Sequence, residues 1–491
     1  MSTYRVLYCS SEAYPLIKTG GLGDVAGSLP RALQQLGHDV RLVLPAYREV
    51  MQSLPHRPRL CVETRVGIYP VRIWQTTLPG TRVTTWLVDC EPLYDRPGNP
   101  YLDADGDPWP DNARRFALFC EVVALMARDQ FGMDWQPGIV HCNDWQTGLV
   151  PVLLEDPPGP RPATVFTIHN LAYQGIFDRA TFEHLNLPEP MWHYERLEYH
   201  GQFAFIKGGL VYADRLNTVS PGYAKEIQTA MFGHGMEGLL SHRSDRVSGI
   251  LNGIDTRTWN PGTDPLITQR YNWQHLDDKL PNKLALQQHF GLPQQEEALL
   301  FGMVSRLVEQ KGIDLVLESL SLLFKLPLQL VILGSGAKRY EQALHKAADQ
   351  YSQQLGVEIG YDEQLAHAIE AGSDLFLMPS RFEPCGLNQM YSQRYGSLPL
   401  VTPVGGLADT VVDANQDNLQ QGAASGFVMA GINRAALQGA VQRALLLYQQ
   451  PDSWRQLQKA AMKKDFSWAK SASSYTQLYA QALRDKSHAP I

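Results

Sequence analysis

The sequence predicts an α/β protein with parallel sheets, and three observations support this prediction. Short apolar runs typical of buried strands alternate with helical stretches along the chain. At 491 residues the chain is longer than one ordinary hydrophobic core supports, so two domains are expected. A polar stretch that carries Pro and Gly, residues 247–283, interrupts the alternation, and the domain junction is predicted near its start.

The expected strands are short and apolar, with helical stretches between them. In the first half of the chain they lie at residues 6–8, 40–44, 83–88, 139–141, 164–168 and 215–219. In the second half they lie at residues 299–305, 328–333, 375–378 and 398–402. The alternation predicts parallel sheets with right-handed crossovers. Residues 468–483 predict an amphipathic helix near the end of the chain.

Charge and cysteine content argue against several classes of protein. A net charge of -7 argues against nucleic acid or an anionic membrane as the main partner, so an anionic ligand needs a local cluster of cations. The six cysteines are scattered without a CxxC pair, which predicts free thiols in a reducing compartment and no zinc site. No signal peptide precedes the first strand and no apolar run could span a bilayer, so a cytoplasmic protein is expected.

Glu383 lies in residues 380–387, SRFEPCGL, directly after the expected strand at 375–378. Pro384 suits the first turn of a following helix. Glu383 is therefore expected at the carboxyl end of a strand, where open α/β sheets bind their ligands. The alternative is that Glu383 only caps the helix, and local spacing alone favours that alternative.

Two similar glycine-containing stretches, one in each half, are expected to open helices. They are residues 20–25, GGLGDV, and residues 405–411, GGLADTV. Paired glycines let the backbone approach a ligand, and a helix start offers N–H groups to phosphate, although such loops also serve as plain turns. Lys18, just before the first stretch, can oppose a pyrophosphate, or it is simply a solvated lysine. Asp24 can complement the helix dipole.

Further candidates follow other expected strands. Arg306 and Lys311 lie on the loop after residues 299–305 and could clamp a leaving diphosphate, or form an exposed ion pair. His169 and Asn170 follow residues 164–168, where a neutral imidazole could orient a sugar hydroxyl, or be a structural histidine. Asn252 precedes Gly253, a pair that also forms a turn without any ligand.

Two of these stretches carry a resemblance to a known family. Residues 381–387 with Gln389 and Tyr391 resemble the donor-site signature of bacterial glycogen synthases and plant starch synthases. Residues 18–25, KTGGLGDV, resemble the N-terminal signature of the same family. Many retaining nucleotide-sugar transferases have a second glutamate where this chain has Tyr391, and that departure agrees with the glycogen and starch synthase branch.

The resemblance implies the GT-B architecture, in which two Rossmann-like, doubly wound domains face each other across a deep cleft. It implies an acceptor-side domain at residues 1–248, a nucleotide-sugar donor domain at 249–464, and a C-terminal helix at about 465–491 that crosses back to the first domain. The implied activity is glycogen synthesis, in which glucose passes from ADP-glucose to the non-reducing 4-hydroxyl of an α-1,4-glucan with retention. The implied partners are those two substrates, without a cofactor or a metal.

The resemblance also assigns site residues. The implied catalytic residues are Glu383, His169, Lys18, Arg306 and Lys311. The implied donor-binding residues are Lys18, Gly20, Gly21, Asp24, Asn170, Asn252, Arg306, Lys311, Tyr361, Cys385, Gly386, Leu387, Gly405, Gly406 and Thr410, with Tyr361 stacked on the base. The implied acceptor-binding residues are Tyr101, Asp144 and Trp145, although large aromatic side chains are more often part of a core.

Other functions remain open at this point. The same fold could use UDP-glucose, or transfer to a small sugar as sucrose synthases do. A non-catalytic glucan-binding protein would keep the aromatic residues but would not need Lys18, Arg306, Lys311 and Glu383 together.

Overall fold

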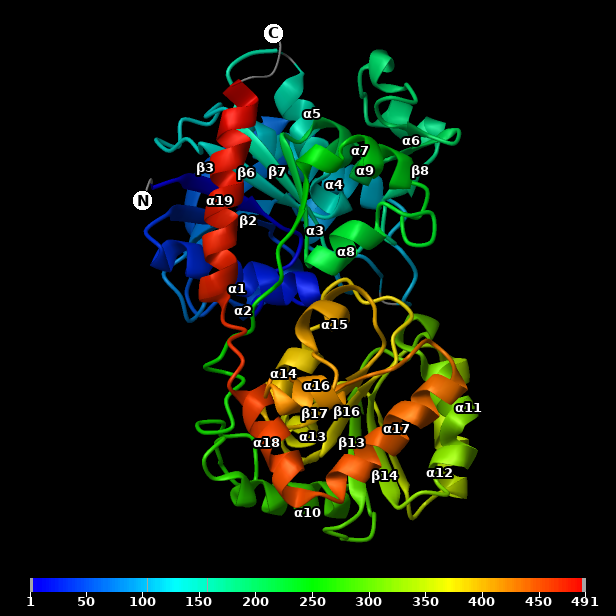
Figure 1. The fold of residues 1–491 in the computed structure, drawn as a ribbon. Coiled ribbons are helices and arrows are strands. Elements are labelled where there is room, and N and C mark those ends of the chain that lie inside the picture. Colours follow the sequence, from blue (N-terminus) through cyan, green and yellow to red (C-terminus); the bar gives the residue numbers. More distant parts are fainter. Residues whose placement is uncertain (1–2, 104, 157, 488–491) are drawn as a thin grey trace. The chain divides into compact units, whose positions relative to one another are not determined.

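The computed structural model describes residues 3–103, 105–156 and 158–487 (Figure 1). Residues 488–491, the end of the expected C-terminal helix, lie outside the described residues. The chain forms two compact units, Met1–Gly253 with Trp468–Ile491, and Ile254–Ser467. The first unit is therefore built from both ends of the chain, and the second is one continuous segment.

The first unit contains one large sheet whose strands run β12-β11-β7-β6-β1-β2-β5-β4-β3. In that order the strands are Val247–Gly249, Arg215–Thr218, Ala163–Ile168, Ile139–Asn143, Arg5–Cys9, Asp39–Pro45, Thr84–Asp89, Tyr69–Thr77 and Arg59–Val66. The strands from β12 to β5 pair in parallel, as expected. The central strands β1, β6 and β7 are almost entirely buried, which explains their continuous apolar runs.

One edge of this sheet differs from the sequence prediction. Strands β3 and β4 pair antiparallel with each other, and β4 pairs antiparallel with β5. Many β3 and β4 side chains are exposed or half-buried, so these strands lack the apolar run that marks the others. A small antiparallel sheet was also not predicted, and it consists of β8 (Ile176–Phe177), β10 (Gln202–Ala204) and β9 (Glu198–Tyr199).

Helices connect the strands of the first unit. The α-helices are α1 (Gly21–Gln35), α2 (Arg48–Ser53), α3 (Glu91–Tyr94), α4 (Asn112–Ala127), α5 (Leu149–Glu155), α6 (Arg179–His184), α7 (Phe205–Tyr212), α8 (Pro221–Glu226), α9 (Glu237–His242) and α19 (Trp468–Ser487). Short 3₁₀ turns lie at Trp145–Thr147, Glu189–Met191 and Ser244–Arg246. Helix α1 begins directly at the first glycine stretch, as the sequence predicts.

The C-terminal helix α19 packs on the first unit, beside α1 and strands β7 and β11 (Figure 1). Its Tyr479 hydroxyl lies 2.8 Å from Nδ1 of His141 on β6, and Asn217 of β11 donates to the Tyr475 hydroxyl at 3.1 Å. Successive residues of β7 face opposite sides of the sheet. Thr167 contacts His141 on the side of α19, whereas Phe166 packs against Gly209 of α7. Helices α7 and α19 therefore cover opposite faces of the sheet.

The second unit contains a parallel sheet of order β15-β14-β13-β16-β17-β18. Its strands are Leu355–Ile359, Leu328–Gly334, Leu299–Val304, Leu375–Met378, Leu398–Val401 and Phe427–Val428. Leu330 and Ile332 of β14 belong to one hydrophobic cluster, whereas Val331 and Leu333 belong to another. Because successive strand residues face opposite sides, the two clusters are the cores on the two faces of this sheet.

Helices cover both of these cores. The α-helices of the second unit are α10 (Leu280–His289), α11 (Ile313–Leu323), α12 (Lys338–Gln350), α13 (Glu363–Gly372), α14 (Asn388–Arg394), α15 (Gly405–Thr410), α16 (Gln416–Gln420), α17 (Arg434–Tyr448) and α18 (Pro451–Met462), with 3₁₀ turns at Leu276–Lys279 and Glu309–Lys311. Helices α11, α12 and α17 supply buried residues to one core, and α10, α13 and α15 supply them to the other. Each unit is thus a doubly wound, Rossmann-like layer structure.

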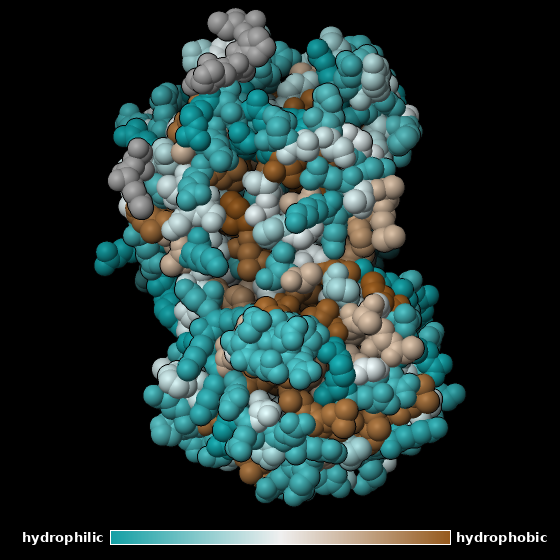
Figure 2. All heavy atoms as spheres, viewed as in Figure 1, coloured by the Kyte–Doolittle hydropathy of each residue, from teal (hydrophilic) through white to brown (hydrophobic). Residues whose placement is uncertain are grey.

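The surface is predominantly hydrophilic on the face shown in Figure 2, where hydrophobic residues form smaller patches. Within the described part of the chain, no helix combines the length and apolar character that a membrane span requires.

Candidate functional site

In the second unit, candidate residues gather on the loops that follow the neighbouring strands β13 and β16. Lys311 Nζ donates to Glu383 Oε2 at 2.6 Å, and the Ser380 hydroxyl donates to the same oxygen at 2.9 Å. The Glu383 residue is only 5% exposed. The ammonium and the hydroxyl donor compensate the burial of this carboxylate and fix its orientation.

Backbone contacts join these two loops directly. The Arg381 N–H donates to Gln310 O at 2.8 Å, and Gln310 Nε2 donates to Phe382 O at 3.2 Å. Gly312 adopts φ +72°, and a Cβ there would lie 2.2 Å from Pro379 O. Only glycine satisfies both demands, so this position sets how closely the loop that carries Lys311 approaches the loop that carries Glu383.

Glu383 does not cap a helix. Helix α14 begins at Asn388, and its N-cap residue Leu387 makes no side-chain cap bond. Pro384 therefore lies in the loop rather than in the first turn of the helix, which corrects the sequence prediction. The three residues between Pro384 and the helix form a tight loop with Gly386 at φ +72°.

Arg306 lies on the same loop as Lys311, immediately after β13, and its side chain is exposed. Two basic residues thus follow one strand, five positions apart. Neighbouring parallel strands end at the same edge, so these cations and Glu383 belong to one edge of this sheet.

The second glycine stretch packs against the loop of Glu383. The Gly406 N–H donates to Glu383 O at 3.0 Å, and a Cβ at Gly406 would lie 2.1 Å from Cys385 O. The Thr410 hydroxyl donates to Gly406 O at 2.6 Å and accepts from Gln389 Nε2 at 3.1 Å. Gly405 opens α15 with φ +43°. Gly406 and Thr410 therefore hold the loop from its buried side.

The remaining second-unit candidates differ in exposure. Cys385 is 5% exposed, so its thiol is almost fully enclosed. Tyr361 follows β15 and Gly360, and 76% of the residue is exposed.

In the first unit, Lys18 and Asp24 form an ion pair at 2.7 Å at the start of α1. Gly23 packs closely on Lys18, because a Cβ at Gly23 would lie 3.2 Å from its Cα. The buried carboxylate of Glu12 accepts from the N–H groups of Thr19, at 2.5 Å, and Gly20, at 3.2 Å. The glycine loop is therefore fixed by a carboxylate that the sequence analysis did not single out.

His169 follows β7 and lies beside the end of β6. Its backbone N–H donates to Asp144 Oδ1 at 2.7 Å, and its Nε2 lies 2.9 Å from Asn143 Oδ1. Burial lowers the pKa of His169 to about 3, so the imidazole is neutral at neutral pH. Asn170, next along the chain, accepts the Ala172 N–H with its side chain.

Asp144 is unusual in backbone and in charge. It has φ +56°, a conformation rare outside glycine, and such strain is concentrated at functional sites. Burial raises the pKa of its carboxyl to about 7, although hydrogen bonds from the backbone of His169 and Asn170 act in the opposite direction. The carboxyl thus gains or loses its proton near neutral pH.

The two aromatic candidates of the first unit are tied into its interior. The Tyr101 hydroxyl donates to Glu12 Oε1 at 2.5 Å and lies 2.8 Å from the Ser11 hydroxyl. Trp145 packs on Phe116, Phe177 and Phe205, with ring centroids 5.0, 6.0 and 5.8 Å away. A Cβ at Gly175 would lie 2.3 Å from the Trp145 ring.

Asn252 is 5% exposed, and among the described residues its buried Oδ1 has no hydrogen-bond partner.

With this geometry described, comparisons with known proteins decide the family. Residues 5–242 match the starch synthase catalytic domain, and residues 286–462 match glycosyl transferases group 1. Glycogen synthase 1 of Methylococcus capsulatus is 54% identical over 479 residues, which are 98% of this chain and 97% of that protein. Glycogen synthase of Cellvibrio japonicus is 53% identical over 478 residues, which are 97% of this chain and 99% of that protein. The chain belongs to the glycogen synthase family.

Solved structures agree with this membership. The catalytic domain of starch synthase IV from Arabidopsis thaliana, bound to ADP and acarbose, superimposes with a TM-score of 0.88 at 32% identity, over 98% of this chain and 100% of that chain. Sucrose-phosphate synthase from Thermosynechococcus elongatus has a TM-score of 0.60 at 16% identity, over 98% and 99%, and supports the fold alone. The predicted family, the GT-B fold of two Rossmann-like parts and the glycosyltransferase activity are confirmed.

Several residues that contact the candidate residues within each unit were missed by the sequence analysis. Glu12 and Asn143 contact Gly20 and His169, and Ser380 contacts Glu383. Each of the three lies just after a strand or at its last residue, so the strand-end rule that found the others could have found them too. Gln389, quoted only as part of the family signature, supports the loop through Cys385 O and Thr410.

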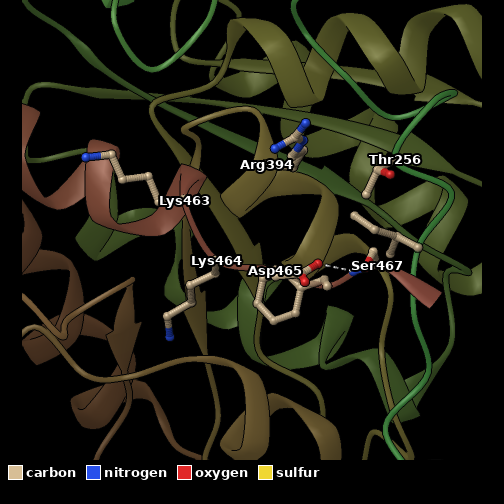
Figure 3. A pocket seen from close by; sticks show the side chains of 8 residues that line it. Thr256, Arg394, Lys463, Lys464, Asp465 and Ser467 are labelled. Carbon is tan, nitrogen blue, oxygen red and sulfur yellow. Dashed lines mark hydrogen bonds between the residues drawn. The ribbon is translucent and has the colours of Figure 1, made fainter. Parts of the chain in front are cut away.

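A small cavity of about 250 Å³ lies where the second unit begins and ends (Figure 3). Arg394, Lys463 and Lys464 line it, but Figure 3 shows that their side chains point in different directions. Lys463 lies over the Trp273 ring and Lys464 donates to the Ser425 hydroxyl. These contacts engage both ammonium groups, so the cavity has no convergent cationic site. Among the described residues, no group of three or more His, Cys, Asp or Glu could hold a metal.

Proposed function

We propose that this glycogen synthase family member transfers glucose from ADP-glucose to the non-reducing 4-hydroxyl of an α-1,4-glucan such as glycogen, with retention of configuration. The observation that carries the proposal is the buried Lys311–Glu383 pair beside Arg306, in a chain 54% identical to a glycogen synthase over nearly its whole length. ADP in the related starch synthase IV structure supports the adenine nucleotide.

Charge stabilisation is the main task of the second unit in this proposal. Arg306 binds the diphosphate in a bidentate manner and Lys311 acts as a point charge, and both stabilise the negative charge that grows as the sugar leaves. Lys18, from the first unit, adds a third positive charge to the same diphosphate. Glu383 orients the glucose and offsets its positive charge in an oxocarbenium-like transition state.

Retention without a covalent intermediate is the second part of the proposal. Tyr391, where many relatives of the wider class have a second glutamate, is 7% exposed and stacks on Trp259 with ring centroids 3.9 Å apart. It therefore offers no carboxylate for a glycosyl-enzyme intermediate of the kind retaining hydrolases form. We propose that the acceptor hydroxyl attacks from the face that the diphosphate leaves.

The two units have different substrate roles in this proposal. We assign the acceptor side to the first unit, where Tyr101, Asp144 and Trp145 shape the glucan site and His169 orients a sugar hydroxyl. We assign the donor side to the second unit, where the ring of Tyr361 stacks on the adenine. The other donor contacts are proposed at Gly20, Gly21, Asp24, Asn170, Asn252, Cys385, Gly386, Leu387, Gly405, Gly406 and Thr410.

Neither a cofactor nor a metal is part of the proposed reaction, because three cations serve the diphosphate. All six cysteines are free thiols, which favours a reducing, cytoplasmic compartment.

The experiment offers radiolabelled ADP-glucose or UDP-glucose with glycogen and measures label bound to polymer. We expect incorporation from ADP-glucose and much less from UDP-glucose. Preference for UDP-glucose would overturn the choice of donor. Absence of incorporation from both donors would overturn the synthase proposal.

A further inference from the structure

Asn143, the last residue of β6, has an orientation that its neighbours determine. Its Nδ2 donates to Cys9 O at 2.9 Å and lies 3.4 Å from His141 O. Both partners are carbonyl oxygens, which only accept hydrogen bonds. The amide nitrogen therefore faces β1 and β6, and the amide oxygen Oδ1 must face the other way.

The amide oxygen meets two side chains. The Tyr8 hydroxyl donates to Oδ1 at 3.1 Å, and His169 Nε2 lies 2.9 Å from the same atom. An amide oxygen only accepts, so the His169 nitrogen that faces it must carry a proton. Asn143 is completely buried, so its Oδ1 makes these contacts away from bulk solvent.

We propose that Asn143 is a positioning residue that holds His169 in the neutral tautomer with the proton on Nε2, so that Nδ1 is an acceptor for a hydroxyl of the bound sugar. A neutral imidazole protonated on one nitrogen has a lone pair on the other. The opposite tautomer would place the Nε2 lone pair against Oδ1 in a buried site. Among the described residues, the hydrogen bond found for the His169 ring is made by Nε2, which leaves Nδ1 to meet a substrate.

The burial of His169 agrees with this arrangement. Desolvation lowers the pKa of His169 to about 3, which removes the doubly protonated form at neutral pH. The backbone N–H of His169 donates to Asp144, so the ring and the backbone are held by adjacent residues, Asn143 and Asp144. Rotation of the ring would break the Asn143 contact.

A first test uses the sugar substrate, and this test rests on the proposed function. The sugar hydroxyl that meets Nδ1 must donate a hydrogen bond, so replacing that hydroxyl with fluorine removes the hydrogen bond. Donor analogues fluorinated at one position at a time would show a loss of about tenfold in kcat/KM at one position. In His169→Gln, the analogue fluorinated at that position should lose no more kcat/KM than the other analogues. Equal losses in both enzymes at every position would overturn the acceptor role of Nδ1.

The tautomer itself is measured in the full-length enzyme without turnover. Two-bond proton–nitrogen correlation spectra of protein labelled with ¹⁵N-histidine distinguish the two tautomers and the imidazolium, and His169→Gln identifies the His169 signal by its loss. We expect the Nε2-protonated form at neutral pH. The Nδ1-protonated form or the imidazolium would overturn the proposal.

Asn143→Leu tests whether Asn143 is the cause, because leucine keeps the volume and removes the amide. We expect a mixture of tautomers at His169. Tyr479→Phe is the matched control, since it removes a buried hydroxyl near His141 and leaves the His169 contact intact. A pure Nε2-protonated His169 in Asn143→Leu would overturn the proposal.

If Asn143→Leu does not fold, Asn143→Asp takes its place. The groups that face His169 are then the new carboxylate, the Asp144 carboxyl, the His141 imidazole and, beyond residue 143, the Tyr8 hydroxyl. An adjacent carboxylate should raise the titration midpoint of His169 by about 1–3 pH units, and an unchanged midpoint would overturn the role of residue 143. These spectra need no substrate. Their outcome is therefore independent of the glucose incorporation assay, which tests the proposed function.

Discussion

The strand-end sites of the two units have the same position in the fold and opposite electrostatic character. After β13 and β16 of the second unit, Lys311 and Glu383 are buried as an ion pair at 2.6 Å. After β6 and β7 of the first unit, burial lowers the pKa of His169 to about 3 and raises that of Asp144 to about 7. The site of the second unit is an ion pair, whereas in the site of the first unit burial favours the neutral forms of both groups.

The difference shows that burial alone does not decide whether a group is charged. Desolvation disfavours every charged form, and a partner of opposite charge at hydrogen-bond distance offsets it. Glu383 has such a partner, whereas Asp144 accepts hydrogen bonds from the backbone N–H groups of His169 and Asn170. An ionic site suits a diphosphate, and a neutral site suits sugar hydroxyls, so each unit has the electrostatics that its proposed ligand requires.

The largest expected effect comes from removing the charge of the ionic site. Glu383→Gln retains the side-chain shape and the hydrogen-bonding capacity toward Ser380 and Lys311, but it no longer offsets positive charge on the sugar. We expect kcat to fall about 10³-fold, which is about 4 kcal/mol, while the Kd of ADP changes only a few-fold. Initial rates and ADP titrations measure both quantities.

The matched control is Glu358→Gln, which removes a half-exposed carboxylate of β15 that pairs with His289. It should leave kcat unchanged. Near-normal turnover in Glu383→Gln would mean that the carboxylate has only a structural role.

The raised pKa of Asp144 should make the stability of the protein depend on pH. The folded-state pKa of Asp144 is raised from 3.8 to about 7. Between these values the unfolded carboxyl loses its proton while the folded one keeps it, so the native state loses stability as pH rises from about 4 to 7. Asp144→Asn removes this dependence and retains an acceptor for the His169 N–H. Its stability relative to the native protein should therefore increase over that range, by up to about 4 kcal/mol, and level off above pH 7.

Urea unfolding at pH 5 and pH 8 measures this difference. Asp178→Asn is the opposite control, because hydrogen bonds from Thr181 lower the pKa of the exposed Asp178 carboxyl. A lowered pKa stabilises the native state above the unfolded pKa, and that contribution is lost as pH falls through the folded pKa. A pH-independent difference for Asp144→Asn would refute the neutral character of the first site.

A smaller effect is expected from separating the two loops of the ionic site. Gly312→Ala combines a left-handed φ of +72° with a Cβ 2.2 Å from Pro379 O. We expect a stability loss of about 2–4 kcal/mol and a lower kcat, because Lys311 shifts away from Glu383.

Gly291→Ala is the matched control for this change. Gly291 has a similar φ of +67°, but nothing lies within 4 Å of its Cβ position, so only the backbone term of about 1 kcal/mol remains. Urea unfolding compares the two variants. Equal losses would show that the close approach to Pro379 contributes nothing.

The smallest expected effect concerns Glu12. Tyr101→Phe removes a hydroxyl that donates to Glu12, whose carboxylate also holds the loop at Thr19 and Gly20. We expect a stability loss of about 1–2 kcal/mol and a few-fold rise in the KM for ADP-glucose. Tyr448→Phe, which removes a hydrogen bond to Glu296 O in the second unit, should leave that KM unchanged. A rise in both variants would show a general loss of stability.

The sequence predicted the parts of the fold whose signal is local. Buried strands such as β14 are continuous apolar runs, so the strands named from the sequence were predicted to within one or two residues at each end, whereas the helices between them were predicted without bounds. The antiparallel β3 and β4 were missed because their side chains alternate irregularly between exposed and half-buried positions. The start of α14 was also placed too early, since a proline suits a loop as well as a first helical turn.

For the candidate site, the sequence predicted residues that a motif identifies and missed those that act through a neighbour. Glu383 and Lys311 were both named, but their direct contact depends on how Gly312 approaches Pro379. Asn143 was overlooked because its importance lies in the direction of its amide, which Cys9 and His141 determine. The Lys311–Glu383 and Asn143–Cys9 contacts join residues 72 and 134 positions apart, and no local pattern predicts them.

Because α19 belongs to the first unit, the order in which the chain is synthesised differs from the order in which its two units are completed. Translation releases residues 1–253 long before Trp468, yet the hydroxyl groups of Tyr475 and Tyr479 that meet Asn217 and His141 are made last. The first unit to leave the ribosome is thus the last to be completed. We expect a chain that stops before Trp468 to become sensitive to protease within residues 1–253, while the second unit stays resistant.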